Sequence, residues 1–116
     1  MIKKYDELVS KLQSATIARK ISWGKTSGHN EYQTAIGTNS VSIRFHPAID
    51  FGVVPDDTRT YVTMLIYNDK GENIDVITAE KGDYDYGSLF ELYECVRRAS
   101  LKVDETLDEM LAVLNK

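Results

Sequence analysis

Residues 88–114 read SLFELYECVRRASLKVDETLDEMLAVL, and the spacing of apolar residues in this stretch decides the fold of the chain. Ser88 and Glu91 stand three residues apart, as in a capping box, where a hydroxyl and a carboxylate satisfy the free amide groups at a helix start. An apolar stripe at helical spacing follows, made of Leu89, Leu92, Tyr93, Val96 and Ala99. The stretch therefore predicts an amphipathic helix that starts near residue 88.

The end of the same stretch predicts a second amphipathic helix. Asp104 can cap this helix, and its expected buried face carries Leu107, Leu111 and Leu114. On the solvated side of the first helix, Glu94 precedes Arg98 by four residues, the favourable order for an ion pair on a helix surface. We expect both helices to pack against the rest of the protein, and we find no catalytic pattern in either.

The residues before this stretch predict one helix and a series of strands. Apolar residues recur at steps of three and four over residues 2–16, which indicates an amphipathic helix. Period-two patterns typical of strands then appear at residues 20–24, 31–37, 41–46, 60–68 and 73–80. The turn Asn68-Asp-Lys-Gly71 is short, and short turns join antiparallel strands because a parallel pair needs a long crossover.

Together these elements predict an α+β fold in a single domain over residues 1–116. We expect an antiparallel four- or five-stranded meander, with one N-terminal helix and two C-terminal helices packed on one face. The sheet face toward the helices is expected to carry Ile21, Trp23, Tyr32, Ile36, Val41, Ile43, Phe45, Val62, Met64, Ile66, Ile74 and Val76.

The strand at residues 61–67 departs from the pattern of a sheet with one solvated face, because both of its sides are apolar. The outer side is expected to hold Ala35, Arg44, His46, Tyr61, Thr63, Leu65, Tyr67, Ile77 and Ala79. Two explanations stay open: a central strand that tolerates exposed tyrosines, or a contact surface for a second copy or another protein. The candidate interaction residues are Arg44, His46, Tyr61, Leu65 and Tyr67.

The charge of the chain suggests a second class of partner. The net charge is −4, but the first thirty residues are basic, with Lys3, Lys4, Lys11, Arg19, Lys20 and Lys25. A nucleic-acid-associated accessory protein of a mobile element is therefore an alternative, although an ordinary solvated face explains these bases better. Cys95 is the only cysteine and no signal peptide or membrane-spanning run is visible, so we expect a cytoplasmic protein with no membrane association.

The sequence favours a non-catalytic protein over an enzyme. Cys95 lies in a predicted helix without an adjacent basic partner, and His29 and His46 lack further ligands at metal-binding spacing. We expect no metal and no cofactor. The long segment at residues 47–59 either packs on the core or forms a site, so a ligand binder or enzyme with a site near this loop is a further alternative.

Three stretches carry a family likeness: Ile21-Ser-Trp23, Glu31-Tyr32 and the run from Leu92 to Leu107. They resemble a small bacterial family of α+β proteins to which no activity is assigned. The resemblance implies a bacterial or mobile-element origin and one compact domain, and it transfers no site residue. The function expected from the sequence is therefore a small cytoplasmic interaction module that self-associates or binds a partner through the open face of its sheet.

Overall fold

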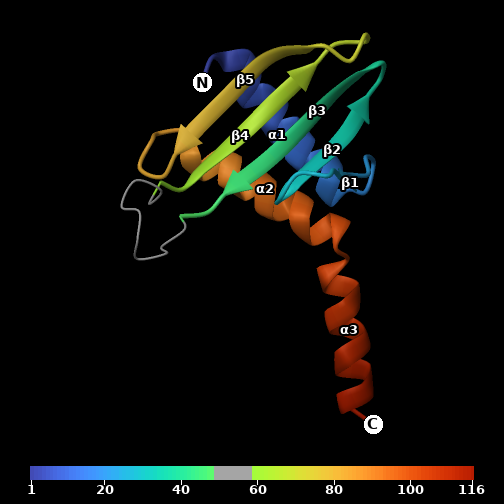
Figure 1. Cartoon of the computed structure of the whole chain (residues 1–116). Helices are drawn as coiled ribbons and strands as arrows, with labels where there is room; N and C mark the ends of the chain where they lie inside the picture. The colour runs from blue at the N-terminus through green and yellow to red at the C-terminus, as the bar shows by residue number, and fades with distance from the viewer. Residues whose placement is uncertain (49–58) are drawn as a thin grey trace.

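The computed structural model describes residues 1–48 and 59–116 (Figure 1). Helix α1 (Lys3–Ile17) is followed by the strands β1 (Gly24–Lys25), β2 (Glu31–Ile36), β3 (Asn39–His46), β4 (Tyr61–Tyr67) and β5 (Asn73–Glu80), then by the helices α2 (Tyr86–Ser100) and α3 (Val103–Leu114). The strands form one sheet in chain order, and every neighbouring pair is antiparallel. The predicted α+β class and antiparallel meander are confirmed.

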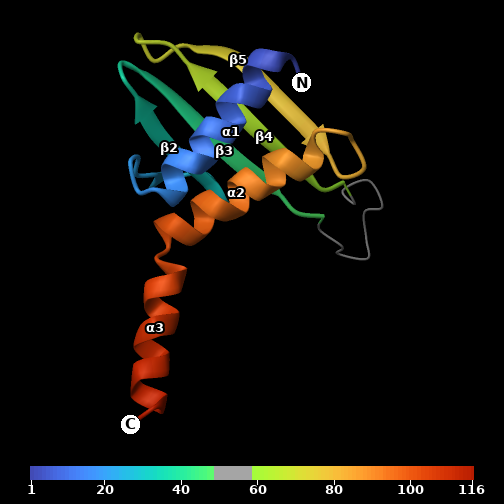
Figure 2. The ribbon, with the colours of Figure 1, turned by 180° about the vertical axis from the view of Figure 1, so that it is seen from behind.

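The core lies between the sheet and two of the helices. Helices α1 and α2 cover one face of the sheet, and the other face has no described helix over it (Figures 1 and 2). Because side chains alternate along a strand, every second residue of β3 and β4 points at the helices. The buried apolar residues of the sheet and helices are Val9, Leu12, Trp23, Tyr32, Val41, Ile43, Val62, Met64, Ala79, Leu89, Leu92, Tyr93 and Val96.

Helix α1 is joined to the start of the sheet by a buried hydrogen bond. The Trp23 indole Nε1 donates to Thr16 Oγ1 at 2.9 Å, and Thr16 Oγ1 donates to the Leu12 carbonyl at 2.7 Å. Both polar groups are therefore satisfied inside the core. The strand predicted at residues 20–24 is wrong, since β1 begins only at Gly24, although Trp23 is buried as expected.

Strand β5 presents the opposite face from the one that the sequence suggested. Ile66 pairs with Asp75 but Tyr67 pairs with Asn73, so a bulge at this point shifts the register by one residue. Such a shift sends every following side chain to the other face. Ile77 and Ala79 consequently face the core, whereas Ile74 and Val76, which were expected inside, are 60% and 50% exposed.

The structure also differs from the prediction at Ile36, which was expected on the inner face, and at Ser88, which was expected to cap a helix. Ile36 is exposed because it pairs with Asn39 at the tip of the β2–β3 hairpin. Helix α2 begins at Tyr86, so Ser88 lies inside the helix, where its hydroxyl donates to the carbonyl of Asp85. The predicted capping box is therefore wrong, and the carboxylate of Asp85 instead pairs with the N-terminal ammonium of Met1.

Helix α3 departs most from the expected packing. It projects away from the sheet and the other helices (Figures 1 and 2). Leu107, Leu111 and Leu114, predicted to be its buried face, are 47%, 55% and 78% exposed, and α3 has no buried residue. Of the two C-terminal helices, only α2 packs on the sheet, because α3 contacts the body near its first turn alone.

Candidate interaction surfaces

The structure gathers all five candidate residues on the outer face of the sheet, the face away from α1 and α2. Arg44 and His46 come from β3, and Tyr61, Leu65 and Tyr67 come from β4. In the register of these strands, His46 pairs with Tyr61, while Leu65 and Tyr67 lie opposite Ser42 and Ser40. Since their inward neighbours, such as Ile43 and Met64, are fully buried, this set faces outward.

The end of the outer face near the start of β4 carries two stacked aromatic rings and an ion pair. The rings of His46 and Tyr61 are stacked, with centroids 4.5 Å apart and planes at 15°. The Arg44 guanidinium lies 3.8 Å from the carboxylate of Glu31, with its side chain 46% exposed. Because Arg44 already has an acidic neighbour, this end is a mixed aromatic and charged surface rather than an open anion site.

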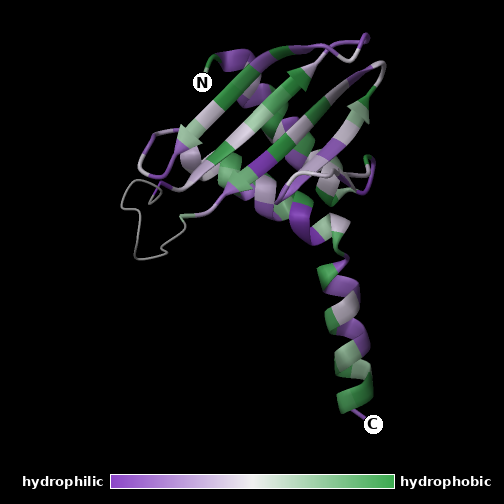
Figure 3. Cartoon of the chain, in the orientation of Figure 1, coloured by the Kyte–Doolittle hydropathy of each residue, from purple (hydrophilic) through white to green (hydrophobic). Residues whose placement is uncertain are grey.

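The other end of the outer face is apolar. Leu65 lies directly opposite Val76, and Tyr67 pairs with Asn73 next to Ile74, so strands β4 and β5 bring these apolar side chains together. Figure 3 shows hydrophobic bands on both strands in the view onto this face. We define the outer patch as Leu65, Tyr67, Ile74 and Val76. The sequence alone missed Ile74 and Val76 because the bulge changed their side of the sheet.

The centre of the outer face is lined by small hydroxyl residues. Ser42 and Thr63 are almost fully buried although no described helix covers them, and the hydroxyls of Thr63 and Thr78 are 3.1 Å apart. The Ser42 hydroxyl is buried without a hydrogen-bond partner among the described residues. Larger side chains around these positions therefore shield a shallow, closely packed floor between the aromatic end and the outer patch.

The free edge of β5 is protected against pairing with another strand. The carboxylate of Asp75 accepts a hydrogen bond from the Val76 amide at 2.8 Å, and that of Asp83 accepts one from the Glu80 amide at 2.8 Å. Asp75 also points inward, where the Tyr5 hydroxyl donates to it. Charged groups placed at an edge strand hinder edge-to-edge pairing, so the broad outer face is the better contact surface.

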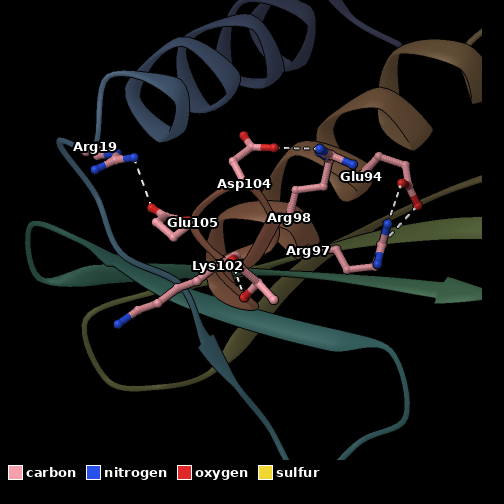
Figure 4. Close-up of polar contacts among 8 residues, drawn as sticks. Arg19, Glu94, Arg97, Arg98, Lys102, Asp104 and Glu105 are labelled. Carbon is pink, nitrogen blue, oxygen red and sulfur yellow. Dashed lines mark hydrogen bonds and ion pairs between the residues drawn. The ribbon is translucent and has the colours of Figure 1, made fainter. Parts of the chain in front are cut away.

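The joint between α2 and α3 is the second candidate region, and charged side chains surround it (Figure 4). Lys102 has a left-handed backbone, with φ 53°, and turns the chain between the two helices. Arg19 pairs with Glu105 at 2.9 Å, and Arg98 pairs with Asp104 at 2.6 Å. These ion pairs fix the first turn of α3 to the body. They also replace the predicted Glu94–Arg98 pair, because Glu94 bonds to Arg97 at 3.0 Å instead.

A cavity of 550 Å³ lies at this joint, lined among others by Ile17, Trp23, Cys95, Arg98 and Lys102. Four of its five charged side chains, those of Arg19, Arg98, Asp104 and Glu105, are engaged in the ion pairs just described. Burial raises the pKa of the Cys95 thiol, which disfavours the reactive thiolate. The cavity thus holds polar side chains but neither an activated nucleophile nor an unpaired carboxylate dyad among the described residues.

The other hypotheses from the sequence concern the basic residues of the first thirty positions, metal binding and the 47–59 loop. Among the basic residues, Lys11 pairs with Glu7 at 3.4 Å and Arg19 with Glu105, so part of the positive charge is locally balanced. Among the described residues, no three His, Cys, Asp or Glu side chains are placed to hold a metal ion. The ligand or enzyme hypothesis near the 47–59 loop rests mostly on residues 49–58, which lie outside the described residues.

In comparisons with known proteins, no family model, no curated protein and no solved structure matches this chain. The resemblance to a small bacterial family therefore stays a prediction. Within residues 1–48 and 59–116, none of the helices has the length and apolar character needed to cross a membrane.

Proposed function

We propose that this chain is a small non-catalytic interaction module that binds a protein surface through the outer face of its sheet. The observation that supports this most strongly is the outer patch, where Leu65 and Val76 lie side by side on β4 and β5 with no described segment covering them. The exposed face of a sheet ordinarily carries polar side chains, whereas this face has apolar side chains at one end and the His46–Tyr61 stack at the other, separated by small hydroxyl residues.

The composition of the outer face suits a protein partner better than a small molecule. It has aromatic and aliphatic side chains toward its ends and small hydroxyl residues at its centre. Tyrosine and arginine are enriched at protein interfaces, where a few well-buried side chains near the centre supply most of the affinity. A small ligand would need a concave site with converging polar groups, and among the described residues neither cavity is lined by the outer patch.

The size of the patch indicates a modest affinity. Each of its four side chains is partly buried already, so completing their burial contributes about 1 kcal/mol apiece. Association itself costs several kcal/mol in lost freedom of motion. The outer patch alone therefore supports a transient complex. A high-affinity complex requires that the partner also covers the His46–Tyr61 end of the outer face.

The test is retention of partner proteins by the immobilised chain from an extract of the cells that encode it. Leu65→Asp and Val76→Asp place a charge in the outer patch, and Ile2→Asp is a matched control because Ile2 is 63% exposed at the start of α1. We expect retention of a defined protein by the original chain and by Ile2→Asp, and its loss in both patch variants. Equal retention by all four chains contradicts binding through this face.

A further inference from the structure

Helix α3 carries an apolar stripe that has no partner within the described residues. Val103 is half-buried at the joint, and the exposed large apolar side chains that follow are Leu107, Met110, Leu111, Val113 and Leu114. The opposite side of the helix holds Glu105, Glu109 and Ala112, all exposed. The helix is therefore amphipathic, yet its apolar side faces solvent (Figure 3).

A helix of this length needs packing to be stable. Isolated helices shorter than about 12 to 15 residues are marginal in water, because nucleation is costly and each added residue contributes little. Helix α3 has 12 residues, and its contacts to the body are the half-buried Val103 and the two ion pairs of its first turn. Exposed ion pairs stabilise little. Covering the stripe is thus the main available source of stability for the distal turns.

The stripe has the same spacing when it is read in either direction. From Val103 to Leu107, Met110 and Leu114 the steps are four, three and four residues. When two such helices run antiparallel about a twofold axis, Val103 of one lies opposite Leu114 of the other, and Leu107 lies opposite Met110. A contact related by a twofold axis requires such self-complementarity, and steps of three and four are those of paired helices.

The charges of α3 select the antiparallel orientation. All of its acids, Asp104, Glu105, Asp108 and Glu109, lie in the first seven residues, and Lys116 follows the last turn. In a parallel pair the acidic halves would lie side by side, and Asp108 and Glu109, which have no ion-pair partner among the described residues, would repel the same residues of the other copy. In an antiparallel pair each acidic half lies beside the uncharged half of the other helix, and the helix dipoles also oppose favourably.

From this spacing, exposure and charge distribution, we propose that α3 is a self-association helix that pairs antiparallel with the α3 of a second copy of this chain. The pair leaves the two sheet domains at opposite ends, so each outer face stays free for another protein. This surface is separate from the outer patch and does not depend on it. A helix pair only about 18 Å long is a small interface, so the dissociation constant is expected on the order of 10⁻⁵ M.

The first experiment measures the mass of the full chain by sedimentation equilibrium from about 5 µM to about 500 µM, a range that brackets such a dissociation constant. We expect a monomer–dimer equilibrium. Leu107→Asp should raise the dissociation constant at least about tenfold, because it places a charge at the centre of the contact. Ala112→Asp introduces the same charge on the opposite side of α3 and should leave the equilibrium unchanged.

The second experiment tests the orientation by disulfide formation in a Cys95→Ala background. The variants Val103→Cys and Leu114→Cys are oxidised separately and as an equal mixture. The antiparallel pair brings residue 103 of one copy to residue 114 of the other, so the mixture should form a mixed disulfide dimer while each variant alone does not. Two homodimers, one from each variant alone, would indicate a parallel pair and overturn the orientation.

Three other results overturn the self-association of α3. One is a monomer over the whole concentration range, which would mean that a different protein, and not a second copy, covers the apolar stripe of α3. Another is an unchanged dimer in Leu107→Asp, with circular dichroism at 222 nm confirming that the body of that variant is folded. The third is loss of the dimer in Leu65→Asp but not in Leu107→Asp, which would assign self-association to the outer patch and leave the proposed function standing.

Discussion

Leu65 on β4 lies directly opposite Val76 on β5, and both side chains face away from the helices. This pairing exists because of the bulge between Ile66 and Tyr67, which sets the register of β5. Without that bulge, Val76 would point into the core and the outer patch would lose half of its apolar members. The register of one strand therefore determines whether this face carries the outer patch.

That register can be tested by placing a charge on each side of β5. Val76→Asp should lower the free energy of unfolding by less than about 1 kcal/mol, because Val76 is half exposed. Ala79→Asp should lower it by more than about 3 kcal/mol, since Ala79 is 2% exposed and an unpaired carboxylate there is costly. Urea denaturation followed by circular dichroism measures both. A larger loss of stability in Val76→Asp than in Ala79→Asp would mean that Val76 faces the core and Ala79 faces solvent.

The buried hydrogen bond between Trp23 and Thr16 makes a second prediction. Thr16→Val keeps the shape of the side chain but leaves the indole N–H without an acceptor, which should cost about 1 to 3 kcal/mol of folding free energy. Thr16→Ser keeps the hydroxyl and should cost less. Urea denaturation followed by Trp23 fluorescence measures the difference, and equal stabilities of the two variants would show that the hydrogen bond contributes nothing.

Asp75 should give the stability a measurable dependence on pH. The hydrogen bond from the Tyr5 hydroxyl, and after it the one from the Val76 amide, lower the pKa of this carboxyl below its ordinary value of 3.8. A lowered folded-state pKa contributes stability that is fully present above the ordinary value and is lost as the pH falls through the folded-state pKa.

Tyr5→Phe removes the first of these bonds, so the pKa of Asp75 should rise toward its ordinary value. The variant should be less stable than the original chain at neutral pH, and the difference should shrink on acidification below about pH 4. Unfolding free energies measured between about pH 7 and pH 2 test this. A difference that stays constant over that range would indicate that the two groups are not coupled.

The joint at Lys102 makes a prediction about backbone conformation. Lys102 has a left-handed φ of 53°, which glycine adopts without steric cost and β-branched residues adopt poorly. Lys102→Gly should therefore be tolerated within about 1 kcal/mol, whereas Lys102→Val should destabilise the joint by about 1 to 2 kcal/mol. Thermal unfolding compares them, and an equally stable valine variant would contradict the left-handed turn.

The helices and strands of the body could be predicted because their apolar spacing is long and regular. The alternation around Ile43 and the stripe from Leu89 to Val96 each fit only one kind of element, and both were found as expected. Five residues named as an interaction surface, from Arg44 to Tyr67, also lie on one face, since β3 and β4 pair without interruption.

The remaining errors have physical reasons. The run from Ile74 to Ala79 has apolar residues at both alternating positions, so its spacing could not show which side faces the core, and the bulge decided it. An apolar stripe such as that of α3 has the same sequence whether it packs within its own chain or against another molecule. Its exposure could therefore only come from the structure.

The central claim is that the outer face of the sheet is covered by another protein in the cell. The most direct measurement is cross-linking in the cells that encode the chain, with a photoreactive amino acid at position 65, and at position 7 on the exposed side of α1 as the control. We predict a discrete cross-linked protein from position 65 and none from position 7. No adduct at position 65, or the same adducts at both positions, would contradict the proposed function.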